Sequence, residues 1–112
     1  MLNQTILVGK IIGNPVKEVL DNNKMKTRLT LEIKRGFKNP DTMQYDSDFV
    51  TVDLSEGITS TAYDHLKAGV TVGVKARICS VTKETDEGII YVPEILGEKI
   101  TFISASKQSE TW

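Results

Sequence analysis

The residues best suited to chemistry in this chain are aromatic rings set among charges, in the stretch IKRGFKNPDTMQYDSDFV of residues 33–50. Phe37 has a surrounding too polar for a core ring, and Phe49 is opposite in phase to the apolar Val50, so we expect both rings to lie outside the core. Exposed rings beside charges can hold a flat molecule. Packing at the ends of a hairpin is the alternative, and for Tyr45 the two interpretations stay equally open.

Nucleophilic, acid–base and metal chemistry have little support in the sequence. The single histidine, His65, and the single cysteine, Cys79, allow neither a zinc-ligand spacing nor an internal disulfide. No carboxylates pair at a suggestive spacing, and neither GxGxxG nor GxxxxGK occurs. We therefore expect no enzyme, no cofactor and no metal site, with His65 structural and Cys79 inert. A reducing, cytoplasmic setting is the default expectation.

The charge is divided along the chain. The formal net charge of −1 over 112 residues argues against a strongly basic nucleic-acid binder. Residues 1–40 nevertheless hold eight Lys or Arg against three Asp or Glu, while residues 41–112 hold six against twelve. The length predicts a single domain, and neither an export signal nor an apolar run near the twenty or so residues of a membrane span is present. Whether the basic residues share a face decides what the division means.

The first forty residues read as strands. TILVGKII (5–12) is β-branched and aliphatic with a bend at Gly9; GNPV is expected to end it, and VKEVL (16–20) follows as a short extended piece. DNNK (21–24) predicts a hairpin turn. Residues 25–34 alternate, with Met25, Thr27, Leu29, Leu31 and Ile33 on one face and Lys26, Arg28, Thr30, Glu32 and Lys34 on the other. That pattern predicts a half-buried strand with a largely cationic outer face.

The remaining elements complete a small β fold. A loop of about a dozen residues leads to a strand at FVTVDL (49–54), and apolar residues four apart predict a short helix over 55–66. In residues 70–78, Val70, Val72, Val74, Ala76 and Ile78 are expected to point inward. A polar turn at 82–88 precedes a strand at 89–96, in which Pro93 should lie at an edge, and a short segment follows at 99–103.

This order of elements favours an all-β fold, a five-stranded Greek-key OB-fold barrel with a short helix between strands 3 and 4. An SH3-like barrel or a β-sandwich does not naturally place a helix there.

The chain resembles the bacterial single-stranded DNA-binding proteins. The resemblance is carried by LNQTILVGKIIGNPVKEV, LTLEIKRGF, DFVTVDL, AYDHLKAG and YVPEILG, whose order and spacing follow the family over roughly residues 3–103. It implies sequence-tolerant binding of single-stranded DNA in replication, recombination or repair, by a homo-oligomer, either a dimer or a tetramer. It also implies an OB-fold DNA-binding domain over residues 1–103 and a short tail over 104–112.

In that family, surface aromatics stack on bases while basic residues hold phosphates. Phe37 and Phe49 match two of the aromatic positions, and Tyr91 matches a tyrosine of the last barrel strand. The nucleic-acid-binding residues that the resemblance and the cationic face together indicate are Lys10, Lys26, Arg28, Lys34, Arg35, Phe37, Lys38, Phe49, Arg77 and Tyr91.

The sequence also departs from the family pattern. Ser55 and Lys83 stand at two further aromatic positions, and Cys79 and Val81 stand where basic residues are common. We therefore expect weaker DNA binding than is usual, or a shorter path for the strand. The ending SASKQSETW lacks the family's acidic tail, so tail-mediated recruitment of partners is not expected. The alternative function is an OB-fold protein-interaction or primosome-like assembly module with weak DNA binding.

Overall fold

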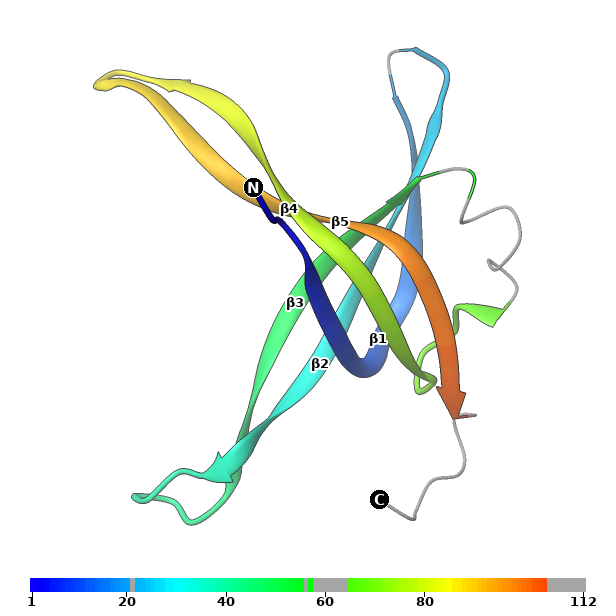
Figure 1. The fold of residues 1–112 in the computed structure, drawn as a ribbon, viewed down its shortest axis with the longest axis vertical. Coiled ribbons are helices and arrows are strands. Elements are labelled where there is room, and N and C mark those ends of the chain that lie inside the picture. Colours follow the sequence, from blue (N-terminus) through cyan, green and yellow to red (C-terminus); the bar gives the residue numbers. More distant parts are fainter. Residues whose placement is uncertain (21, 56, 58–64, 105–112) are drawn as a thin grey trace.

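The protein is a closed barrel of five β-strands. The computed structural model describes residues 1–20, 22–55, 57 and 65–104. The strands are β1 (Thr5–Val19), β2 (Met25–Lys38), β3 (Tyr45–Ser55), β4 (Thr71–Thr85) and β5 (Gly88–Ser104). They are hydrogen-bonded in the order β1-β2-β3-β5-β4, with β4 closing back onto β1 (Figure 1). All neighbours are antiparallel except β3 and β5. The predicted all-β, five-stranded barrel is confirmed, whereas the helix expected over 55–66 falls mostly outside the described residues.

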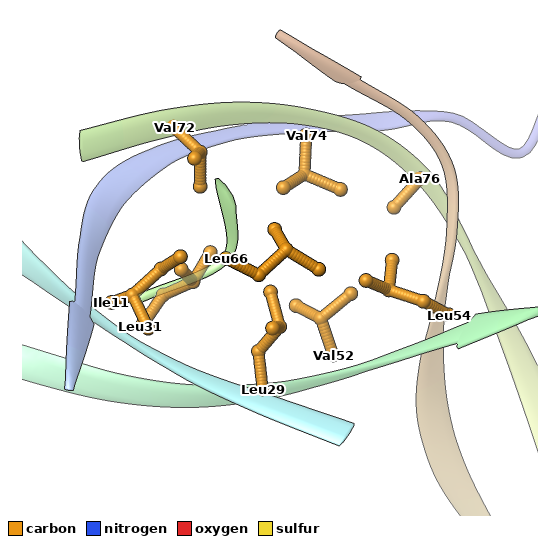
Figure 2. Packing of buried hydrophobic residues seen from close by; sticks show 9 residues of the cluster. All are labelled: Ile11, Leu29, Leu31, Val52, Leu54, Leu66, Val72, Val74 and Ala76. Carbon is orange, nitrogen blue, oxygen red and sulfur yellow. The ribbon is translucent and has the colours of Figure 1, made fainter. Parts of the chain in front are cut away.

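The core follows from the alternation of the strands. Inward-facing side chains of β1 to β4 meet inside the barrel, together with one leucine from the segment before β4 (Figure 2). The buried set is Ile11, Leu29, Leu31, Val52, Leu54, Leu66, Val72, Val74 and Ala76. Removing each of the leucine, isoleucine and valine side chains in this set from water contributes roughly 1.5–3 kcal/mol. The predicted inward face of β2 is confirmed at Thr27, Leu29 and Leu31.

The prediction that Ile78 points into the core is wrong. Its side chain is 49% exposed, because β4 continues past the barrel to Thr85 and pairs there with β5 alone. The β2–β3 and β4–β5 hairpins both extend well beyond the barrel wall (Figure 1). We refer to residues 78–95 of the second hairpin as the β4–β5 arm. Most of the polar turn expected over 82–88 belongs to these strands, because β4 runs to Thr85 and β5 begins at Gly88. The two strands predicted at 89–96 and 99–103 form one continuous strand, β5.

The first strand is also longer than predicted. The GNPV segment does not end it; the pairing of β1 with β2 shifts register between Ile12 and Val16, and β1 continues to Val19. Gly13 lies in this irregularity with a φ of 71°, a left-handed conformation that glycine adopts without steric cost. The bend therefore turns β1 without breaking it.

Two further expectations concern the length of the β2–β3 loop and the position of Pro93. The long loop between β2 and β3 is shorter than predicted, because Lys38 already pairs with Tyr45. Pro93 lies where β5 pairs with β4 only, since β3 meets β5 at Ile95–Gly97, so its predicted edge position is confirmed. Within the part of the chain that the structure describes, no helix could cross a membrane and no cluster of potential metal ligands occurs.

Candidate nucleic-acid interface

The outward face that runs across β1, β2, β3, β5 and the adjoining β4 forms one continuous surface, which we call the outer wall. Strand register aligns Lys10 with Glu32 and Glu32 with Phe49, so the three side chains form a row across β1, β2 and β3. Neighbouring strands are about 4.8 Å apart, which puts Lys10 and Phe49 roughly 10 Å from each other. The Phe49 ring is 65% exposed, as its alternation predicts. A ring and a cation are thus presented together to the solvent.

A second row crosses four strands. Arg28 is paired in register with Asp53, Asp53 with Leu96, and Leu96 with Arg77. Asp53 lies on the outer wall, because it shares the outward strand phase of Phe49, yet it is only 6% exposed. Arg28 Nε donates a hydrogen bond to its Oδ1 at 2.9 Å, and Lys26 Nζ lies 3.7 Å from its Oδ2. This hydrogen bond and the carboxylate charge raise the pKa of Arg28.

The β2–β3 hairpin beyond the barrel holds the second ring. Phe37 is 70% exposed and lies where the pairing of β2 with β3 is irregular, between Lys34 and Lys38. Lys38 Nζ lies 5.8 Å from the centre of the Tyr45 ring, within cation–π range. The side chain of Tyr45 therefore holds the Lys38 cation at the end of β2, one residue after Phe37.

Arg35 is held by Asp48, on the opposite face of the hairpin from Phe49. It makes two hydrogen bonds to Asp48, from Nε at 3.2 Å and from Nη2 at 2.8 Å. Asp48 directly precedes Phe49 in β3, so alternation puts this ion pair on the opposite face of the hairpin. The hydrogen bond from Arg35 lowers the pKa of Asp48, and the same contact raises the pKa of Arg35.

A groove opens on the outer wall where β3 and β5 diverge. Its volume is about 440 Å³, within the range of small-molecule sites. β3 contributes Phe49 to it, β5 contributes Glu94, and β2 contributes Arg28. The groove is lined by Arg28, Phe49, Val50, Thr51, Asp53, Val92, Pro93, Glu94 and Ile95.

The structure thus brings some predicted residues together and separates others. The outer wall holds Lys10, Arg28, Lys34, Phe49 and Arg77, with Lys26 at its margin, while Phe37 and Lys38 lie further along the β2–β3 hairpin. Tyr91 is 72% exposed and pairs in register with Thr82 in the β4–β5 arm, where alternation puts it out of phase with Glu94 and with Leu96 of the second row.

Sequence reasoning missed the carboxylates that pair with the predicted cations. Lys26, Arg28, Arg35 and Arg77 all form ion pairs, the last with Glu98 at 3.4 Å. Lys10, Lys34 and Lys38 form none with the residues that the structure describes. The position of Asp53 opposite Arg28 in a predicted hairpin could have indicated their ion pair. No pattern in the sequence indicated that Glu94 lines the groove.

Comparison with known proteins identifies the family. The model of the single-strand binding protein family matches residues 2–103. Single-stranded DNA-binding protein B of Bacillus subtilis (strain 168) is 29% identical over 104 residues, covering 92% of this chain and 91% of that protein. Single-stranded DNA-binding protein 1 of Staphylococcus aureus (strain Mu50) is 27% identical over 112 residues, covering 99% and 71%.

Solved structures agree on the fold. The Plasmodium falciparum SSB in complex with ssDNA superimposes with a TM-score of 0.74 at 16% identity, over 93% of this chain and 96% of that one. A deletion mutant of the single-stranded DNA binding protein from Thermus aquaticus gives 0.73 at 20% identity, over 92% and 51%. These similarities confirm the OB fold. Since the family model spans nearly the whole chain, the protein belongs to the single-strand binding protein family.

Proposed function

We propose that this protein binds single-stranded DNA with little regard to base sequence, holding the strand against the outer wall. Membership of the family makes it a non-enzymatic DNA-binding protein. The observation that carries the proposed site is the exposed Phe49 ring on a wall shared with Lys10 and Arg28. A base stacked on a ring contributes about 1–3 kcal/mol regardless of its identity, because every base has a π face.

The strand would run from the β2–β3 hairpin toward the groove. Phe37 and Lys38 would meet it first, Lys34 and Phe49 next, and Arg28 and Arg77 would hold phosphates beyond the ring. Four of the predicted cations already have carboxylate partners, so each must share its charge between a protein anion and a phosphate. This supports the expectation of weaker binding and a smaller salt dependence than a fully unpaired cationic surface would give.

We assign the binding domain to residues 1–103 and a short tail to 104–112, a division supported by the extent of the family match. A homo-oligomer, dimer or tetramer, is supported by apolar side chains exposed on β1. Ile6 is 67% and Val8 51% exposed. Gly73 of β4 lies between Val8 and Ile103, since a Cβ added to it would lie 3.4 Å from Ile103 Cδ1 and 3.9 Å from Val8 Cγ2. The exposed apolar surface therefore continues from β1 over β4 to β5. A cytoplasmic location and a role in replication, recombination or repair complete the proposal.

Fluorescence anisotropy with labelled oligothymidine tests this proposal. Affinity should fall as salt rises and should fall further in a Phe37→Ala, Phe49→Ala double variant. Tyr91→Ala is the matched control, since it removes an equally exposed ring that neither lines the groove nor shares the strand phase of Glu94 and Leu96. We expect it to bind like the wild type.

The proposal fails if the protein does not bind oligothymidine at low salt. A stoichiometric protein partner captured from nuclease-treated lysate, together with undetectable binding of oligonucleotides, would instead support the assembly-module function. The comparisons do not favour that alternative.

A further inference from the structure

The groove between β3 and β5 is lined by the carboxylate of Glu94. Glu94 is half-buried and lines the groove, yet it forms no hydrogen bond or ion pair with the described residues. Arg28, which also lines the groove, is bound through its Nε to Asp53 instead. Glu94 contributes to Arg28 only a Coulomb attraction, the weakest of those acting on that guanidinium. Its two oxygens are therefore available as acceptors.

A free carboxylate beside a proposed DNA path constrains what can enter the groove. It repels phosphate, so the backbone would pass on the side of Arg28, whose terminal amino groups are not used by the hydrogen bond to Asp53. A base entering from that side could lie against the Phe49 ring, which lines the same groove. Its hydrogen-bonding edge would then face Glu94.

The chemistry of that edge decides which bases fit. An ionised carboxylate only accepts hydrogen bonds. Cytosine and adenine present an exocyclic amino group, and guanine presents an amino group beside a ring N–H. Thymine and uracil place a carbonyl oxygen where cytosine has its amino group, and their one donor on this edge, the ring N3–H, lies between two carbonyl oxygens, so a carboxylate that approaches this edge meets oxygen.

We propose that the groove is a nucleobase subsite in which Phe49 stacks on the base and Glu94 selects for an amino group on its edge. The subsite makes one position of an otherwise sequence-tolerant strand prefer cytosine, adenine or guanine over thymine. It rests on the proposed function, because the base must belong to a strand already held on the outer wall. Thr51, which also lines the groove, supplies a hydroxyl that can donate or accept.

Oligodeoxycytidine and oligodeoxyuridine of equal length provide the sharpest probe, since their bases differ only along one edge, where the amino group and bare ring nitrogen of cytosine replace the carbonyl and N3–H of uracil. Measured at mildly alkaline pH, the wild type should bind oligodeoxycytidine roughly fivefold more tightly, the effect of one hydrogen bond. In Glu94→Gln the ratio should fall to near one, because an amide can either donate or accept. Glu94→Ala should give the same loss of preference.

Glu98→Gln is the matched control, because it removes a carboxylate that pairs with Arg77 outside the groove lining. It should change the affinity for both oligonucleotides while leaving their ratio at the wild-type value. Retained binding of oligodeoxyuridine by Glu94→Gln would show that this variant is folded.

Equal affinity of the wild type for the two oligonucleotides, or a ratio that survives both Glu94 variants, would overturn the subsite and leave the proposed function standing. Failure of the wild type to bind either one at low salt would overturn the proposed function, and the subsite with it.

Discussion

Replacing Asp53 with asparagine should move stability and DNA affinity in opposite directions. The side chain is nearly isosteric, so the packing between β2 and β3 is kept while one negative charge is removed. Asp53 receives the Arg28 Nε hydrogen bond at 2.9 Å and lies 3.7 Å from Lys26 Nζ. Both cations stay in place after the substitution, without the carboxylate that holds them together.

The expected loss of stability is moderate because the cations can be solvated. Removing one partner of a fully buried ion pair costs about 3–5 kcal/mol, but the Arg28 side chain is 47% exposed. Exchanging a charged acceptor for a neutral one costs about 1 kcal/mol, and the weaker Lys26 contact adds about 0.5 kcal/mol. At fixed protein concentration this lowers Tm by about 4–8 °C for a domain of this size.

DNA affinity should rise in the same variant. An Arg28 guanidinium no longer shared with Asp53 can neutralise a phosphate, so affinity at low salt increases roughly threefold and the salt dependence steepens by about 0.7 for that contact. Differential scanning fluorimetry and anisotropy on the same preparations measure the two effects. Glu87→Gln, which removes a charge from the turn of the β4–β5 hairpin, controls for net charge.

Two results would refute this reasoning. An unchanged Tm would mean that the Asp53 carboxylate does not stabilise the outer wall. A fall in affinity would mean that Asp53 positions Arg28 for DNA and does not compete for its charge.

Three further substitutions test other parts of the structure. Asp48→Asn should destabilise the protein at neutral pH. The hydrogen bond from Arg35 lowers the pKa of the Asp48 carboxyl in the folded protein. The resulting stabilisation is present above the unfolded pKa and is lost as pH falls through the folded pKa. In urea unfolding measured at several pH values, the difference in stability between Asp48→Asn and wild type should therefore vanish below the folded pKa. Gly97→Ala should cost about 1–3 kcal/mol in urea unfolding, because the new Cβ would lie 2.6 Å from Leu54 Cδ2. Thr27→Val should stabilise the protein by about 1 kcal/mol in the same assay, since the fully buried Thr27 hydroxyl has no hydrogen-bond partner among the residues that the structure describes.

Gly36→Ala is the control for Gly97→Ala, because a Cβ at Gly36 meets nothing within 4 Å. Equal effects of the two substitutions would contradict the steric explanation. A destabilised Thr27→Val would show that the hydroxyl is satisfied in solution, and an Asp48→Asn difference that persists in acid would exclude the Arg35 ion pair as its cause.

Much of the barrel was predictable because strand alternation is a local property. The apolar residues at every second position of β2 and β4 indicated which face is buried, and the opposite phase of Phe49 placed its ring outside. Strand ends were predicted less well. Ile78 continues the apolar alternation of β4, yet it is exposed, because periodicity does not report where a hairpin leaves the barrel.

The sequence alone was enough to determine a small β-barrel with exposed rings, a cationic β2 and no catalytic constellation, because residue types and their spacing act within one strand or hairpin. Only the tertiary structure decided which cations are neutralised and where a groove forms. The pairing of Leu96 with both Asp53 and Arg77, and the divergence of β5 from β3 beside Phe49, join segments that are distant in the chain. The charge and shape of the site depend on those non-local contacts, which no local pattern of residues reveals.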